Sequence, residues 1–561
     1  MGTNRTDTEE PPQPPLSGAS LTRRTVIAAG VAGVAGWQLL ERPARAATAV
    51  RPVAASSRAT TPATAVPAAL PHPAAVYSGS ADPADLGVLE AASLLRAGKL
   101  SSQELTAACQ RRIAARNGPV TFGGSPTTIN AWIRLYPDLA HQLAVAADDR
   151  LARARKSGVP APALCGVPLA LKDLYAVKGL PLTASSHVLD GNIAAGDSTV
   201  WAKLKAAGMV LLGHTHTHEF ALGLLTPQTG NPWNLANSVG GSSGGSAAAL
   251  AARMVPAATG TDTGGSLRSP PSATGVCGLK PTFGLVSAHG VVPIGWSIDH
   301  AGPMARSAGD LGLLLSALAG PDPADPATLA GPPPAVYPTL PRTGSRPLAG
   351  VRLGVPGTAT SGLPAAVAAL FERALGELRS LGAVLVPFTE PDQSSVGFTL
   401  DSLGALGVEA GVYHSQFFPA RAPYYGTSLG PLVAALVAAA DTLPAGAYVQ
   451  TQQQRLQYMH AWNAAFASHS LDAVLKPGAT VDGAPRTGTA GAEPAVTGDF
   501  SWADVAGLPV VALTIGRSPA TGMPFGIQIG GAPHTEARIL QVAIDYQAHF
   551  PYHQAAPPGL P

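Results

Sequence analysis

The sequence predicts an α/β fold in which a mixed β-sheet is covered by helices on both faces. From about residue 164 onward, short apolar runs alternate with Gly-rich turns and helical patterns, which is typical of such a sheet. Of the 561 residues, 46% are hydrophobic and 12% are charged, and the chain contains 63 Gly and 54 Pro. This composition indicates a large interior joined by many loops, and one large unit with insertions is compatible with the length.

The N-terminal segment has the features of an export signal. The pair Arg23-Arg24 precedes an apolar stretch over residues 26–40, and an A-x-A pattern follows at 44–46. The paired arginines resemble a twin-arginine signal, and the stretch of about 15 residues is shorter than the roughly 20 that a membrane span requires. We therefore expect residues 1–46 to be a cleaved signal peptide recognised by the twin-arginine export machinery, and the mature protein to be secreted or periplasmic. An uncleaved membrane anchor is the alternative.

The hydrophobic periods then place a linker, helices and strands along the chain. Residues 47–75, rich in Ala, Pro and Thr, predict a disordered linker ahead of a folded body over 76–555. We expect helices at 88–95, 105–113, 139–156, 198–207, 246–253 and 363–381, and strands at 167–171, 209–212, 351–355, 507–514 and 523–531. The Pro-dense segment 321–347 predicts a surface connection, and the Ala-rich segment at about 395–468 predicts a helical insertion.

Charge and cysteine content exclude several classes of protein. The net charge is +2, from 36 basic and 34 acidic residues, and no run of Lys or Arg marks a nucleic-acid-binding surface. We therefore expect a small-molecule substrate and no nucleic acid partner. Cys109, Cys165 and Cys277 lack metal-ligand spacing, and their odd number leaves at least one thiol free.

Two Gly/Ser-rich segments carry the chemical features of the sequence. The first covers residues 240–246 and includes Ser242, and the second is Thr263-Gly264-Gly265-Ser266. Glycines permit tight turns and close approach of the backbone to a ligand. Successive backbone N–H groups in the second segment can converge beside the Ser266 hydroxyl, as in an oxyanion hole, which suits acyl transfer. A Gly/Ser run taken alone also fits a flexible loop.

Lys172 ends the apolar run at 166–171 and is a candidate base. At its ordinary pKa near 10.4 a lysine is protonated, but burial favours the neutral amine. The alternative is a lysine whose ammonium group reaches water while its stem is buried.

Taken together, these segments resemble the amidase signature family. Further matching segments are Asn231-Pro232-Trp233-Asn234, 275–282, 299–303, Gly507-Leu508-Pro509 and 524–528, so the resemblance covers about residues 85–550. It implies an amidase signature fold and hydrolysis of a carboxamide C–N bond to a carboxylic acid and ammonia or an amine. The resemblance implies that the activity requires no cofactor and no metal.

The resemblance also implies a Ser-cisSer-Lys triad. Ser266 would be the nucleophile that forms an acyl-enzyme, Ser242 the bridging serine after a cis peptide bond, and Lys172 the base. Backbone N–H groups of Thr263, Gly264, Gly265 and Ser266 would form the oxyanion hole. Asp262 and Arg268 flank the nucleophile, where an ion pair or a backbone clamp is at least as well supported as a catalytic role.

Other interpretations stay open at this point. Residues 240–244 also fit the G-x-S-x-G elbow of lipases with Ser242 as nucleophile, although the preceding segment is polar and contains Pro232. His214, His216 and His218 would lie on one face of a strand, where a pocket or structural role is favoured over a metal site because no fourth ligand is evident. An esterase or carbamate hydrolase would use the same machinery, and a non-catalytic secreted binding protein would keep the fold.

Overall fold

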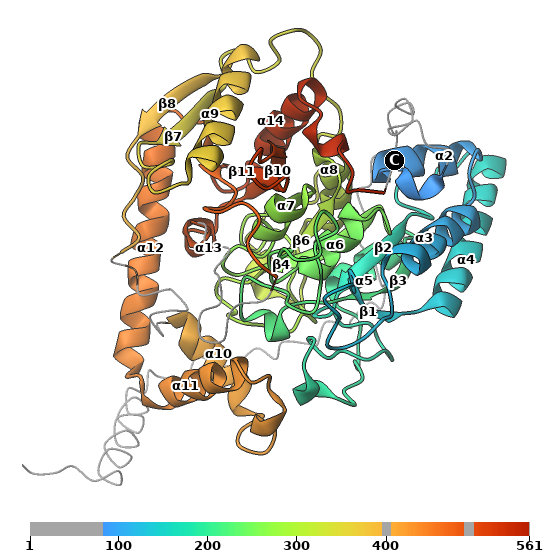
Figure 1. Cartoon of the computed structure of the whole chain (residues 1–561), viewed down its shortest axis with the longest axis horizontal. Helices are drawn as coiled ribbons and strands as arrows, with labels where there is room; N and C mark the ends of the chain where they lie inside the picture. Colours follow the sequence, from blue (N-terminus) through green and yellow to red (C-terminus); the bar gives the residue numbers. More distant parts are fainter. Residues whose placement is uncertain (1–81, 395, 397–404, 487–498, 560–561) are drawn as a thin grey trace, which may run out of the picture. The chain divides into compact units, whose positions relative to one another are not determined.

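The computed structural model describes residues 82–394, 396, 405–486 and 499–559 (Figure 1). The chain divides into two compact units, residues 1–62 and residues 63–561, so every described residue belongs to the second unit. The expected signal peptide over 1–46 and linker over 47–75 lie outside the described residues.

The described residues form one sheet of 11 strands in the order β1-β3-β2-β4-β6-β5-β10-β11-β9-β7-β8. The strands are β1 (Trp132–Leu135), β2 (Pro168–Lys172), β3 (Val210–Thr215), β4 (Ala257–Asp262), β5 (Cys277–Lys280), β6 (His300–Ala305), β7 (Arg352–Pro356), β8 (Val384–Phe388), β9 (Ala473–Pro477), β10 (Val510–Arg517) and β11 (Pro524–Gly530). Strand β2 pairs in parallel with β3 and β4, and β7 with β8 and β9, whereas the other pairs are antiparallel. The predicted mixed sheet is confirmed.

Both faces of the sheet are covered. In β9, Ala473 and Leu475 belong to one hydrophobic core cluster, and Val474 between them belongs to a second. Strand β10 shows the same alternation, with Val511 in the first cluster and Val510 in the second. Because successive side chains of a strand point to opposite faces, the two clusters lie on opposite sides of the sheet.

The helices that cover the sheet are α2 (Val88–Ala97), α3 (Ser102–Arg116), α4 (Pro137–Ser157), α5 (Thr199–Ala206), α6 (Gly244–Ala251), α7 (Ser269–Thr274), α8 (Ala308–Leu318), α9 (Ala365–Ser380), α13 (Ser501–Val505) and α14 (Glu536–His549). Six of them, α2 to α6 and α9, begin within three residues of where the sequence predicts, whereas α7, α8, α13 and α14 were not predicted. Helix α3 illustrates the cause, because Ser101 and Glu104 form a capping box at its first turn. Helices α4, α6, α8 and α14 contact β3, β4, β6 and β10 respectively.

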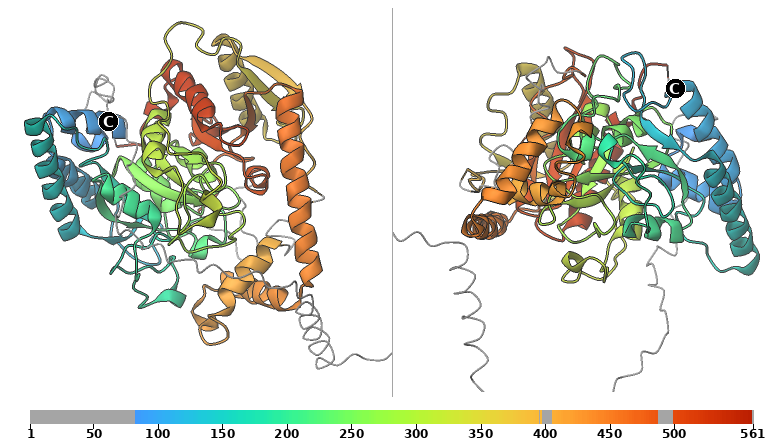
Figure 2. Two further views of the ribbon diagram at one scale, coloured as in Figure 1. Left: turned by 180° about the vertical axis from the view of Figure 1, so that it is seen from behind. Right: turned by 90° about the horizontal axis from the view of Figure 1, so that it is seen from below.

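The expected helical insertion consists of α10 (Ala405–Ser415), α11 (Leu429–Thr442) and α12 (Ala445–Ser468). Helices α10 and α11 pack side by side near one end of α12, and the other end of α12 leads to the strands at the β7–β8 edge of the sheet (Figures 1 and 2). Val433, Leu436 and Trp462 of the insertion join the second core cluster. Among the described helices, no single one has the length and hydropathy of a membrane span, although α11 and α12, which meet at a 104° bend, reach them together.

Candidate active site

The predicted triad residues come from segments that the sheet brings to one edge. Lys172 ends β2, Ser242 lies in the loop before α6, and Ser266 lies in the turn between β4 and α7. Because β2 and β4 are parallel neighbours, their carboxyl ends meet at the same edge of the sheet. Ligands of α/β sheets bind in the crevice outside these carboxyl ends.

Lys172 is fully buried among hydroxyl groups. Its Nζ donates hydrogen bonds to Ser242 Oγ at 2.7 Å, Ser243 Oγ at 3.0 Å and Thr261 Oγ1 at 2.7 Å. Burial lowers the pKa of Lys172 to about 7, although Asp262 and Asp299 favour its charged form. A large fraction of Lys172 is therefore neutral near neutral pH, as a general base requires.

The peptide bond between Gly241 and Ser242 is cis, as the resemblance implied. A Cβ atom on Gly241 would lie 2.1 Å from the carbonyl oxygen of Leu225, so only glycine fits at this position. The loop is therefore packed tightly against the neighbouring backbone and does not form the flexible loop that a Gly/Ser run also allows.

Ser266 lies in a turn that the carboxylate of Asp262 holds through two hydrogen bonds. The carboxylate of Asp262 accepts hydrogen bonds from the backbone N–H of Gly265 at 2.5 Å and of Leu267 at 3.0 Å, on either side of Ser266. Gly265 has a φ of 125°, and a Cβ there would lie 2.6 Å from the ring of Phe500. The N–H of Gly265, expected to face the oxyanion, is engaged by Asp262 in this structure because the turn directs it inward.

Arg268 connects this turn to the C-terminal part of the chain. Its guanidinium, fully buried, forms ion pairs with Asp262 and with Asp504, the latter at 2.5 Å. It also donates to the carbonyl of Phe500 at 2.5 Å and to Gln528 Oε1 at 3.1 Å. Burial disfavours the charge, but the two carboxylates outweigh it and raise the pKa of Arg268. The expected ion pair and backbone clamp are confirmed.

Two residues that contact the candidate site residues are not evident from the sequence motifs. Thr261 provides one of the three hydroxyls around Lys172, and Asp504 provides the second carboxylate on Arg268. The sequence does indicate that Asp504 has a partner. It is an isolated acidic residue in the apolar run at 502–508, and a carboxylate in a buried run must be paired.

The three histidines of the His-x-His-x-His pattern do not share a strand face. Strand β3 ends at Thr215, so only His214 lies within it. His214 contacts the hydroxyl of Tyr136 at 2.7 Å and the carbonyl of Tyr175 at 3.1 Å, and His216 contacts the carbonyl of Thr121 at 3.0 Å. Both rings are buried, and these hydrogen bonds indicate a structural role. Within the described part of the chain, no group of three or more His, Cys, Asp or Glu side chains could hold a metal ion.

The lipase-type geometry is absent around Ser242. The serine follows a loop rather than a buried strand, and its Oγ contacts a lysine. Asp299 accepts from Thr263 Oγ1 at 2.6 Å, whereas Nδ1 of the adjacent His300 points to the carbonyl of Asp262 at 3.2 Å. The two side chains diverge, so they form no relay to a serine.

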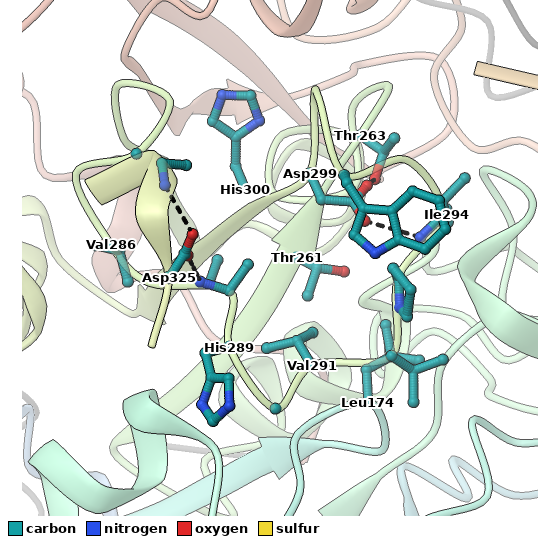
Figure 3. Close-up of a pocket in the computed structure, with 18 of the residues that line it drawn as sticks. Leu174, Thr261, Thr263, Val286, His289, Val291, Ile294, Asp299, His300 and Asp325 are labelled. Carbon is teal, nitrogen blue, oxygen red and sulfur yellow. Dashed lines mark hydrogen bonds between the residues drawn. The ribbon is translucent and has the colours of Figure 1, made fainter. Parts of the chain in front are cut away.

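A cavity of about 570 Å³ opens beside the triad, within the range typical of small-molecule sites. Thr261, which contacts Lys172, and Thr263, which precedes the nucleophile turn, both line it. Figure 3 shows Thr261 and Val291 facing this space, with Asp299 beside Thr263 and Ile294.

All three cysteines are buried and free. Burial raises the pKa values of Cys109 and Cys277 to about 12, so these thiols stay protonated and are poor nucleophiles.

These features place a buried lysine and two serines at the carboxyl edge of a mixed sheet. The sequence pattern of the amidase family matches residues 104–540. The chain belongs to this family, the amidase signature family, and is a hydrolase acting on carbon–nitrogen bonds.

Known relatives extend the comparison over most of the chain. A glutamyl-tRNA(Gln) amidotransferase subunit of Pseudomonas savastanoi pv. phaseolicola (strain 1448A / Race 6) is 37% identical over 493 residues, which cover 82% of this chain and 97% of that protein. The structure of native peptide amidase from Stenotrophomonas maltophilia is 31% identical, with a TM-score of 0.69, covering 84% of this chain and 97% of its own. The structure of the corresponding glutamyl-tRNA(Gln) amidotransferase subunit from Thermotoga maritima is 25% identical, with a TM-score of 0.67, covering 85% and 98%.

Proposed function

We propose that this chain hydrolyses a small carboxamide through an acyl-enzyme on Ser266, releasing a carboxylic acid and ammonia or an amine. The observation that carries the proposal is the contact of 2.7 Å between Lys172 Nζ and Ser242 Oγ, in a fully buried site where the pKa of the lysine falls to about 7. Such a lysine is an effective base near neutral pH.

In the first half-reaction, protons move along the two serines. Ser266 Oγ attacks the carbonyl carbon and gives its proton to Ser242, which in turn gives its own proton to neutral Lys172. When the tetrahedral intermediate collapses, the C–N bond breaks, Ser242 protonates the leaving nitrogen, and Lys172 returns its proton to Ser242. Water then attacks the acyl-enzyme by the same route and restores Ser266.

The negative charge on the carbonyl oxygen requires nearby hydrogen-bond donors. We assign this role to the backbone N–H groups of Thr263, Gly264 and Ser266, since that of Gly265 donates to Asp262. Asp262 and Arg268 support the proposal indirectly, because they hold the turn that orients these amides.

We favour hydrolysis with water over transfer of ammonia to a second substrate. Two of the compared proteins are named as parts of an amidotransferase, and one is named as a peptide amidase. The twin-arginine pattern at Arg23-Arg24 supports export of this chain, where a tRNA partner would be absent.

The proposal is tested with the full chain on a panel of primary amides, peptide amides, anilides, esters and carbamates. We expect amides to be hydrolysed, and Ser266→Ala and Lys172→Ala each to lower kcat by at least about 100-fold. Trapping of a covalent acyl-enzyme in the wild type but not in Ser266→Ala identifies the nucleophile. A Ser266→Ala protein that keeps full activity, or turnover of esters or carbamates without turnover of any amide, contradicts the proposal.

The export proposal has a separate test. Residues 1–75 fused to a folded reporter should carry it out of the cytoplasm, and the double substitution Arg23→Lys, Arg24→Lys should retain it inside. Mass spectrometry of the exported product then locates the new N-terminus. A reporter that is exported equally with both lysines excludes the twin-arginine route.

A further inference from the structure

The cavity beside the triad has a composition that selects among amides. Most of its lining is apolar, including Leu174, Val286, Val291, Ile294 and Trp296. Among the described residues that line it, the acidic side chains are Asp299 and Asp325, the basic ones are His289 and His300, and neither lysine nor arginine is present. Burial lowers the pKa of His300 well below its ordinary value, so this ring is neutral. A substrate carboxylate in this cavity would therefore meet two acidic groups and no lysine or arginine.

The acidic groups are held in place by the protein. Asp299 accepts from Thr263 Oγ1 at 2.6 Å and from the backbone N–H groups of Ile294 and Gly295 at 2.8 and 3.1 Å. Asp325 accepts from the N–H of Ala288 at 2.8 Å. These bonds fix both carboxyl groups in the wall, so they cannot turn away from an incoming anion.

The position of the cavity indicates which part of the substrate enters it. In the proposed mechanism the leaving nitrogen must face Ser242, which protonates it, and none of the three triad residues lines the cavity. The cavity meets the site at Thr261, which contacts Lys172, and at Thr263, which lies three residues before Ser266. Because Thr263 belongs to the turn that carries Ser266, we place the acyl group, which faces away from Ser242, in the cavity.

We propose that the cavity is the acyl subsite, an inference that rests on the proposed function. This subsite takes uncharged, apolar acyl groups and rejects acyl groups that carry a carboxylate. Glutamine and its analogues, whose acyl chain ends in charged groups, are therefore poor substrates. An apolar pocket gains free energy from each buried methylene, whereas an unpaired buried carboxylate costs several-fold more.

A matched pair of primary amides tests the proposal with the full-length enzyme. 5-Methylhexanamide and glutaramate have the same chain, but the first ends in an isopropyl group and the second in a carboxylate. We expect kcat/KM to be at least about 100-fold higher for 5-methylhexanamide. Acetamide, too short to fill the cavity, serves as the reference substrate.

A substitution in the cavity should change this preference. Val291 lines the cavity and is partly buried, so Val291→Lys places a cation there. The ratio of kcat/KM for 5-methylhexanamide to that for glutaramate should then fall at least about tenfold. Val291→Met, of similar length but uncharged, should keep the wild-type ratio. Val159→Lys, at a valine that is 68% exposed and outside the lining, should also leave it unchanged.

The outcomes separate the acyl subsite from the proposed function. If acetamide is hydrolysed in a Ser266-dependent manner but glutaramate matches 5-methylhexanamide, the function holds and the acyl subsite is refuted. An unchanged ratio in a folded Val291→Lys protein refutes it as well. If N-(4-methylpentyl)acetamide is preferred to 5-methylhexanamide, the cavity receives the leaving group instead. If no amide reacts, the proposed function itself fails.

Discussion

Arg268 holds Asp262 in a bidentate ion pair, with Nε to Oδ2 at 2.9 Å and the second guanidinium nitrogen to Oδ1 at 3.1 Å. The same carboxylate binds the backbone on both sides of Ser266. Burial alone would raise the pKa of Asp262, but Arg268 outweighs it and holds the pKa below its usual range. Asp262 therefore stays ionised and holds the turn that carries Ser266, the proposed nucleophile.

Removal of this carboxylate should destabilise the fold as well as the turn. Because Asp262→Ala leaves Arg268 with one buried partner fewer, we expect the free energy of unfolding to fall by about 3 kcal/mol or more. Urea unfolding followed by tryptophan fluorescence measures it. Asp190→Ala is the matched control, since the pair of Asp190 with His187 is more than half exposed and contributes little. Equal losses in the two variants would contradict a special role for Asp262.

In the proposed mechanism, the pKa of Lys172 should set the pH dependence of the reaction. The neutral amine would be the active form, and it is lost as pH falls through the pKa of about 7. We expect kcat/KM to rise about tenfold per pH unit below this value and to level off above it. Buried Lys280 also has a pKa of about 7, so Lys280→Met is the control and should keep the same profile. A profile that changes on removal of Lys280 would assign the titration to that residue.

The hydroxyls around Lys172 should affect its pKa and therefore the pH at which kcat/KM rises. Thr261 Oγ1 accepts from Nζ, and such a bond favours the charged ammonium form. Thr261→Val, of the same shape, removes the acceptor, so the pKa of Lys172 should fall and the rising limb move to lower pH by about 0.7 unit, equivalent to about 1 kcal/mol. Thr215→Val removes a buried hydroxyl that bonds Leu171 and Ser246 and should leave the limb in place. Movement of the limb to higher pH in Thr261→Val would refute this account.

The sequence predicted much of the fold because most elements carry strong local signals. The capping box at Ser101 and the apolar runs of β2, β3, β10 and β11 are visible without a structure. Strand β4, with the sequence Ala-Ala-Thr-Gly-Thr-Asp, carries no such signal, because its small residues suit close packing: a Cβ at Gly260 would lie 2.7 Å from the side chain of Leu267. Small buried residues lack the β-branched pattern by which strands are recognised.

The candidate site was likewise predicted only in part from the sequence. Lys172, Ser242 and Ser266 were predicted from their motifs, and the structure brings Lys172 and Ser242 into contact. The pairing of Arg268 with Asp504 spans 236 residues, so no local pattern could show it. The His-x-His-x-His pattern failed as a strand face because β3 ends at Thr215, where the chain turns to form buried hydrogen bonds.

Glu409 of α10 connects the helical insertion to the wall of the cavity. It accepts hydrogen bonds from the backbone N–H of Ser297 at 3.0 Å and from Ser297 Oγ at 2.7 Å. Tyr448 of α12 donates to the same carboxylate at 2.9 Å. Ser297 lies between Trp296 and Asp299, which both line the cavity. The insertion therefore contacts this wall through the buried carboxylate of Glu409 and through Gln452, which also donates to Ser297, while Tyr413 of α10 lines the cavity itself.

Glu409→Ala should release this wall without changing the triad. We expect KM for 5-methylhexanamide to rise about tenfold, because buried donors lose their acceptor and the wall loses its fixed position, while kcat changes little. KM for acetamide should stay constant, since its methyl group does not reach the wall. Glu372→Ala, at an exposed position on α9, is the control and should change neither constant. A loss of kcat for both substrates, with KM unchanged, would show that Glu409 supports the catalytic groups rather than the cavity.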